Sequence, residues 1–236
     1  MIISDIKSVS RVPVLLCAFL SPVFITLFLV YLFPPIFGLT RSADAFTYVQ
    51  YYSVCSVTLI SAIPFIYGLI FSYIHLTEFQ SRFNKDTEKP GKYGGRTLLI
   101  RMVVSSLISF PMVLTAIYLT DAVSTEGWLR SIFASMLLAI MAPFIFLFVA
   151  GFSRGRNNRK LMSIISLIFL ITAPAGLLLH HPWNYFAFFS PFYWISWAWV
   201  IGSPAESIIY GVISTLIASA CMFVCYRCFI KKSGAG

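Results

Sequence analysis

The sequence predicts an all-α integral membrane protein with six transmembrane helices, an amphipathic interfacial helix at the N-terminus, and a re-entrant or interfacial helical segment before the last span. Hydrophobic residues make up 59% of the 236 residues and charged residues 11%, against about 45–50% and about 25% in soluble domains. Mean hydropathy is +0.87. Such a chain cannot cover its surface with polar groups, and we expect a single transmembrane domain over residues 1–236.

Six apolar segments are long enough to cross a bilayer, which takes about 20 mostly apolar residues in a helix. The two-residue alternation of a membrane β-barrel is absent, and irregular backbone cannot face lipid, so helices are expected. The predicted spans are residues 14–33, 49–74, 97–120, 128–152, 161–179 and 205–228.

Basic residues divide unequally between the two sides of this six-span map. Fifteen of the 17 Lys and Arg residues fall on one side, and only Arg41 and Arg130 fall on the other. Basic residues favour the cytoplasmic side, so both termini are expected there. The net charge of +9 then reflects topology and attraction to anionic lipids. It does not indicate nucleic-acid binding, because no basic soluble face interleaved with stacking aromatics is present.

Residues 1–13 put apolar side chains on one side of a helix and Asp5, Ser8 and Arg11 on the others. This pattern is typical of a helix that lies along the membrane surface. A frayed, solvated terminus is the alternative.

The longest loop on the basic side is predicted at residues 75–96. Helical spacing there places Phe79 and Phe83 on one face, with Glu78 and Arg82 beside them four residues apart. Aromatic anchors ringed by polar groups are typical of transient protein interfaces. From the residues alone, the loop is either a docking surface or a solvated connector.

An aromatic segment precedes the last span on the opposite side. Ten of the 17 residues from 183 to 199 are aromatic, and Trp and Tyr favour the membrane interface. We therefore expect residues 181–200 to lie in or dip into the outer leaflet. The candidate residues of this outer aromatic segment are Trp183, Tyr185, Tyr193, Trp194 and Trp197.

The sequence carries no pattern that supports catalysis or a bound cofactor in this chain. His180-His181 has no Glu in an HExxH arrangement, and no GxxxxGK[ST] phosphate-binding loop occurs. Cys221, Cys225 and Cys228 share one helical face, which fits a metal site or, as we interpret it, plain packing of small apolar thiols. We expect no enzyme activity and no metal site.

Two stretches carry a family resemblance. The first is the predicted loop with Glu78, Asp86, Thr87 and Glu88, followed by Tyr93 and Arg96. The second comprises Ala142-Pro143, the run Phe152–Asn157, Pro182–Tyr185 and Ser190–Trp194. With six spans and both ends inside, the chain resembles permease subunits of ABC-2-type exporters. It looks closest to the small bacterial group that includes drug, bacteriocin and lantibiotic-immunity permeases.

The resemblance implies a subunit of the bacterial cytoplasmic membrane that pairs with an identical or homologous permease and docks on a cytoplasmic ATPase. That ATPase would hold ATP and Mg²⁺, and this chain would bind no cofactor. The complex would export a hydrophobic or amphipathic peptide, drug or lipid-like molecule. The loop between spans two and three would carry the coupling helix, and the candidate ATPase-coupling residues are Glu78, Phe79, Arg82, Phe83 and Asp86.

A second interpretation is a non-enzymatic binding or immunity protein that recognises a peptide or lipid at the outer leaflet through its aromatic segment. An intramembrane enzyme is disfavoured, because the spans carry no cluster of polar catalytic residues.

Overall fold

The computed structural model describes residues 13–32, 45–83, 90–120, 128–153, 156–178, 183–198 and 204–232, and the regular structure in these ranges is entirely helical. The all-α class is therefore confirmed for the described residues. The elements are α2 (Pro13–Leu27), the π-helical η1 (Phe28–Leu32), α4 (Ala45–Phe83), α5 (Pro90–Thr120), α6 (Trp128–Phe152), α7 (Arg156–Leu178), the 3₁₀ helix η2 (Trp183–Ala187), α8 (Pro191–Ser196) and α9 (Pro204–Lys232).

Five described segments are long and apolar enough to cross a membrane. They are Leu15–Leu32, Val54–Glu78, Gly95–Leu119, Ser131–Phe152 and Ala205–Lys231. In α7 the apolar stretch is shorter, Lys160–Pro174. The multi-pass helical architecture is thus present, and a sixth crossing by α7 stays a prediction.

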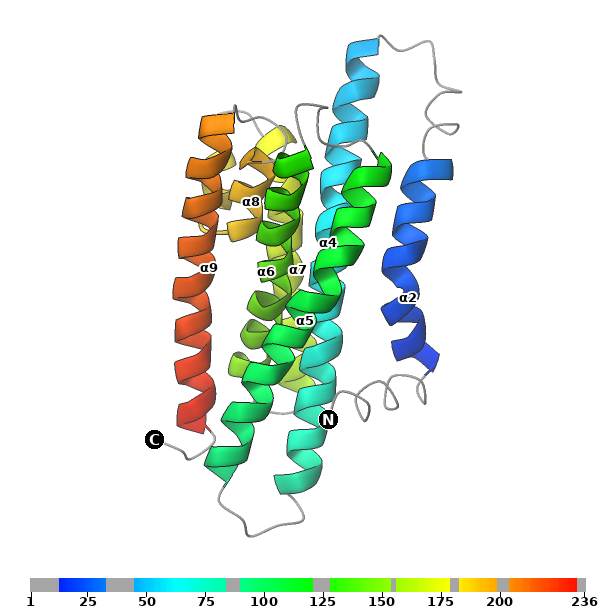
Figure 1. Cartoon of the computed structure of the whole chain (residues 1–236). Coiled ribbons are helices and arrows are strands. Elements are labelled where there is room, and N and C mark those ends of the chain that lie inside the picture. The colour runs from blue at the N-terminus through cyan, green and yellow to red at the C-terminus, as the bar shows by residue number, and fades with distance from the viewer. Residues whose placement is uncertain are drawn as a thin grey trace.

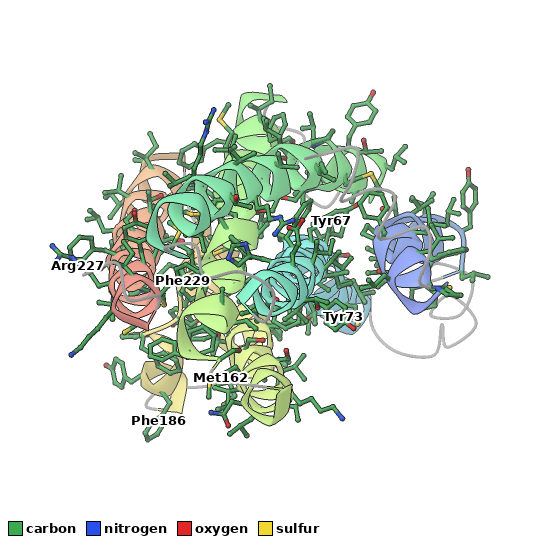
Figure 2. The ribbon with its side chains drawn as sticks, turned by 90° about the horizontal axis from the view of Figure 1, so that it is seen from below. Tyr67, Tyr73, Met162, Phe186, Arg227 and Phe229 are labelled. Atoms are coloured by element: carbon green, nitrogen blue, oxygen red, sulfur yellow. The ribbon has the colours of Figure 1, made fainter. Side chains whose placement is uncertain are left out.

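The long helices run alternately up and down, so two ends of the bundle can be distinguished (Figure 1). At one end α2 begins, α4 ends, α5 begins and α9 ends; we call it the α4–α5 end. At the other lie η2 and α8, which define the α8 end. Viewed along the helices, α2 sits at the edge of the bundle (Figure 2), with only 17% of its apolar window buried.

Helix α6 is the centre of the bundle and packs against α4, α5, α7 and α9. Three glycines allow its neighbours to come close. A methyl group on Gly68 of α4 would lie 2.6 Å from the Ala142 carbonyl oxygen of α6, and one on Gly151 of α6 would lie 2.7 Å from the Cys225 carbonyl oxygen of α9. Gly211 of α9 accommodates the Phe133 ring in the same way. Small residues at helix contacts are the usual route to close packing in membranes.

Helix α4 has 39 residues, which is about 58 Å at 1.5 Å per residue and longer than the roughly 30 Å hydrocarbon core. It continues beyond its apolar window to Phe83, and α5 begins at Pro90. The helices therefore extend through most of the loop predicted at residues 75–96.

The structure tests the predictions for residues 1–13 and 181–200 to different extents. Helix α2 begins at Pro13, so the predicted interfacial helix over residues 1–13 lies, apart from Pro13, outside the described residues. Within 181–200 the structure has two short helices, η2 and α8, joined by a turn. Their depth relative to a membrane stays a prediction.

Candidate functional site

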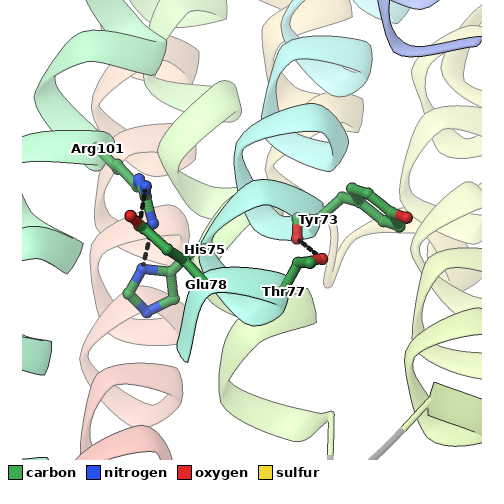
Figure 3. Close-up of polar contacts among 5 residues, drawn as sticks. All are labelled: Tyr73, His75, Thr77, Glu78 and Arg101. Atoms are coloured by element: carbon green, nitrogen blue, oxygen red, sulfur yellow. Dashed lines mark hydrogen bonds and ion pairs between the residues drawn. The ribbon is translucent and has the colours of Figure 1, made fainter. Parts of the chain in front are cut away.

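A buried ionic cluster joins α4 to α5 at the α4–α5 end. The Arg101 side chain is 1% exposed and that of Glu78 is 33% exposed, and Arg101 Nη2 donates to Glu78 Oε2 at 2.5 Å. The second terminal nitrogen, Nη1, lies 3.1 Å from Nδ1 of His75 (Figure 3). One guanidinium thus holds two side chains of the facing helix.

The chemistry of the guanidinium fixes the form of His75 in this arrangement. Arginine has donors and no acceptor, so its contact with Nδ1 requires the lone pair on that nitrogen. We therefore assign His75 as the neutral imidazole with its proton on Nε2. The cluster then carries one positive and one negative charge, which cancel.

The register of α4 brings the two partners to the same side. His75 and Glu78 are three residues apart, and residues at this spacing are neighbours on a helix surface. Thr77 lies between them in sequence but on the other side of α4, where its hydroxyl donates to the Tyr73 carbonyl at 2.8 Å (Figure 3). The helix therefore has a face that meets Arg101 and a face that does not.

Aromatic rings from two more helices close around His75. The Phe146 ring of α6 meets the imidazole edge-on with centroids 5.6 Å apart, and the Phe229 ring of α9 lies 5.4 Å away. Figure 2 shows Phe229 turned into the bundle while Arg227, two residues before it, points outward. Four helices consequently meet at one imidazole.

This packing gives the cluster an apolar surround. Phe146 and Phe229 belong to a separate hydrophobic cluster at this end, which also contains Phe71, Leu98, Leu147, Ala150 and Cys225. Charges surrounded by apolar side chains are poorly hydrated and depend on their partners. The Arg101 cluster is accordingly sensitive to the loss of either bond.

The outer aromatic segment forms a second cluster at the α8 end. Tyr193 and Trp194 of α8 meet edge-on at 5.4 Å, Trp197 lies 6.1 Å from Tyr193, and Tyr210 of α9 lies 5.9 Å from Trp194. The Trp194 indole donates to the Phe188 carbonyl at 2.8 Å. These rings pack against one another, with Tyr193 itself only 1% exposed.

Hydroxyl groups tie this segment to the flanking helices. The hydroxyls of Thr172 in α7 and Ser190 are hydrogen-bonded at 2.6 Å, and Ser214 of α9 donates to the Pro191 carbonyl at 3.0 Å. Both contacts are buried. The short helices are thereby held between α7 and α9.

The structure describes the candidate ATPase-coupling residues to different extents. Glu78 bonds to Arg101 inside the chain, and Phe79, Arg82 and Phe83 follow it in α4, where the structure describes their backbone only. Asp86 lies outside the described residues.

In the outer segment, Tyr193, Trp194 and Trp197 come together, whereas Tyr185 is 49% exposed and touches Phe188. The side chain of Trp183 is outside the described set, as are His180 and His181.

Sequence reasoning missed Arg101 and His75 as site residues. His75 is the first residue of the loop predicted at residues 75–96, and Arg101 is counted among the fifteen basic residues on that side. A signal was present: Arg101 is a charged residue within the predicted span 97–120, and a charge in a span usually has a buried partner. Cys225 of α9 fits the packing interpretation, since it is 2% exposed within the apolar cluster.

The described residues contain no group of three or more His, Cys, Asp or Glu side chains that could hold a metal ion. No curated protein and no solved structure matches the chain. One family model does match, over residues 5–226, and it is described as fluoroquinolones export permease protein Rv2686c-like. Because this match covers nearly the whole of the multi-helix bundle, the chain belongs to the Rv2686c-like fluoroquinolone export permease family, an ABC-2-type permease-like family of membrane proteins.

Proposed function

We propose that this chain is the membrane-spanning subunit of an ATP-driven exporter and that a separate cytoplasmic ABC ATPase supplies the energy. Membership of an export permease family supports the transport role. The observation that carries the ATPase partner is the end of α4, which stays helical beyond its apolar window up to Phe83. A helical projection anchored in the bundle suits a contact through which a soluble subunit moves membrane helices.

The proposed coupling contact is formed by Phe79, Arg82 and Phe83 of α4 together with Asp86. In this arrangement the ATPase binds both ATP and Mg²⁺, and closure of its nucleotide site biases the bundle between two states. Glu78 contributes from inside the bundle, because its carboxylate is engaged with Arg101.

The α4–α5 end is then cytoplasmic, as are both chain termini, in a bacterial plasma membrane. The six-crossing topology, with α7 as a full crossing, belongs to this proposal. A second permease, identical or homologous, completes the path, and lipids cover the remaining apolar helix faces. No enzyme activity is assigned to this chain.

The proposed substrates are hydrophobic or amphipathic molecules, with fluoroquinolone-like aromatic drugs first because of the family description. Peptides and lipid-like molecules remain within the class. At the α8 end, the exposed rings of Tyr185, Phe186 and Phe189 (49%, 72% and 54% exposed) are suited to the membrane interface.

These exposed rings also favour the second candidate function, a non-enzymatic protein that recognises a peptide or lipid at the outer leaflet. Three aromatic side chains near one turn offer the apolar surface that such recognition needs. This candidate requires no ATPase, so the same experiment separates the two.

The test is to purify the tagged full chain from its native membrane in mild detergent and to measure ATPase activity and co-purifying proteins. We expect a stoichiometric ATPase that is lost in the double variant Phe79→Ala/Phe83→Ala. Tyr118→Ala/Phe186→Ala is the matched control, because both rings are exposed (80% and 72%) on parts of the chain away from the α4–α5 end. A wild-type chain that purifies without any ATPase would contradict the proposal and favour the outer-leaflet binder.

A further inference from the structure

Arg101 is unusual among the cations of this bundle. Among the five Lys and Arg residues whose side chains the structure describes, Arg101 is buried, whereas Arg96, Lys160, Arg227 and Lys231 are exposed. An arginine that served only the distribution of charge across the membrane would gain by extending its head group into water. Arg101 instead points into the contact between α4 and α5.

The two bonds of Arg101 define an orientation as well as a distance. The guanidinium is planar and its donors form a rigid fork. Bonds to His75 and Glu78, three residues apart on α4, can both form only when this face of α4 is turned toward α5. The cluster therefore fixes the rotation of α4 about its own axis at this end.

His75 extends this constraint to the rest of the bundle. Its imidazole lies against Phe146 of α6 and Phe229 of α9. A rotation of the last turns of α4 would separate the two bonds and also displace His75 from both rings. The final residues of α4, which begin directly after Glu78, are thus joined to a contact among four helices.

We propose that Arg101 is a positioning residue for energy coupling. By holding His75 and Glu78, it makes the end of α4 and the bundle move together when the ATPase acts on the residues beyond Glu78. This inference rests on the proposed function and sharpens it. Glu78 acts through Arg101 inside the membrane subunit, while the neighbouring aromatic side chains make the contact with the ATPase.

A positioning role has a signature that a docking role lacks. If the cluster only positions α4, weakening it leaves the ATPase bound and active while less substrate moves for each ATP hydrolysed. If Glu78 instead touches the ATPase, its loss releases the ATPase and lowers hydrolysis and transport together.

The experiment uses the full chain with its co-purified ATPase in proteoliposomes and a fluorescent fluoroquinolone as the transported probe. Glu78→Gln removes the charge of the acceptor, and Arg101→Lys keeps the charge but replaces the fork with a single ammonium. Thr77→Ala is the matched control, since Thr77 is exposed on the same turn and bonds within its own helix. Captured ATPase, ATP hydrolysis and drug export are measured on each variant.

We expect the two cluster variants to capture ATPase within about twofold of the Thr77→Ala control, because docking is unchanged. Export per ATP should fall about tenfold, within the usual range of coupling energies between sites. The exchanged pair, Glu78→Arg with Arg101→Glu, should recover export per ATP to within about threefold of wild type. Opposite charges face each other again, and neutral His75 can place its proton on Nδ1 and donate to the new carboxylate, so both contacts are restored with reversed polarity.

Three results would overturn the inference while leaving the proposed function standing: unchanged export per ATP in both cluster variants, loss of captured ATPase in proportion to export, or no recovery by an exchanged pair that accumulates normally. If Glu78→Gln fails to accumulate, Arg101→Lys and the exchanged pair decide by the same ratio. A wild-type chain with no ATPase overturns the proposed function, and the coupling role of Arg101 with it.

Discussion

The two ends of the bundle are held together by different chemistry. At the α4–α5 end, one guanidinium binds a carboxylate and an imidazole of the facing helix. At the α8 end, neutral hydroxyls and packed aromatic rings hold the short helices between α7 and α9. Ionic bonds in an apolar surround are costly to break and depend on direction, whereas ring contacts tolerate small shifts.

Under the proposed function, the α4–α5 end and the α8 end have different roles that match this chemistry. In the proposed exporter the α4–α5 end transmits a displacement, which needs helices whose relative rotation is fixed, and the Arg101 fork would fix it. An end that meets lipid or a passing apolar molecule gains from surfaces that adjust without breaking charged contacts. The following changes test the contrast, in order of decreasing effect.

The largest effect is expected for Arg101→Met. Removing one partner of a buried ion pair costs about 3–5 kcal/mol of the free energy of unfolding, and the lower part of this range applies because Glu78 is one-third exposed. Denaturant titration of the purified chain measures the loss. Arg227→Met is the control at the same end: its guanidinium lies 5.1 Å from the Phe223 ring in an exposed position, so it should cost below about 1 kcal/mol. Equal losses of the free energy of unfolding in the two variants would show that the buried contacts of Arg101 stabilise the chain no more than the exposed contact of Arg227 does.

The next effect compares two glycines at the α6–α9 contact, one near each end. Gly151→Ala should cost about 1–3 kcal/mol, because the new methyl group would meet the Cys225 carbonyl, carbonyl carbon and Cα, all of them backbone atoms. Gly211→Ala meets the tips of the Phe133 and Leu137 side chains, which can rotate away, so its cost should be smaller. The two melting temperatures, taken in the same detergent, test this order, and the reverse order would contradict it.

A smaller effect is expected for the hydroxyls at the α8 end. Ser214→Ala and Thr172→Val each remove one buried hydrogen bond to the short helices, worth about 0.6 kcal/mol on average and about 1.7 kcal/mol at most in membrane helices. Thr172→Val also removes a bond to the Phe169 carbonyl of its own helix. Thr215→Ala is the control, because its hydroxyl bonds to Gly211 of the same helix. Proteolysis of the 183–198 segment should accelerate in the first two variants only. A rate equal to that of the control would show that these bonds do not hold the short helices.

The smallest effect is expected for Trp194→Phe, which keeps an aromatic ring at the centre of the stack and removes the donor to the Phe188 carbonyl. We expect a loss of about 0.5 kcal/mol and drug export unchanged relative to Phe186→Ala, an exposed control. A loss of unfolding free energy as large as that of Arg101→Met would contradict the expectation that ionic contacts at the α4–α5 end are costlier to break than ring contacts at the α8 end.

Helix existence was predictable from the sequence because apolar length is a local property. The apolar windows in α2, α4, α5, α6 and α9 all fall within predicted spans or overlap them closely. The end of α4 was harder to place, since polar residues from His75 onward look like a loop. They remain helical because His75 and Glu78 find a partner in Arg101 and need not leave the bundle for water.

The site was less predictable than the helices. Glu78 and Arg101 are 23 residues apart, and Thr172 and Ser190 are 18 residues apart. Which faces of two helices meet depends on their relative rotation, which hydrophobic length does not encode. Only the presence of a charge within the span 97–120 indicated that Arg101 had a buried partner, without indicating which residue it was.

The length of α4 has a mechanical consequence. It comes close to α6 at Gly68, a position that divides α4 into an arm of about 35 Å toward Ala45 and one of about 23 Å toward Phe83, at 1.5 Å per residue. With Gly68 as the fulcrum, a sideways push at the short arm is magnified about one and a half times at the tip of the long arm. Pro64 lies one turn from this fulcrum, and a proline there removes a backbone hydrogen bond. In the proposed exporter, a small displacement applied at the Phe83 end of α4 would thus appear enlarged at the Ala45 end, with Pro64 as the position where the helix bends most easily.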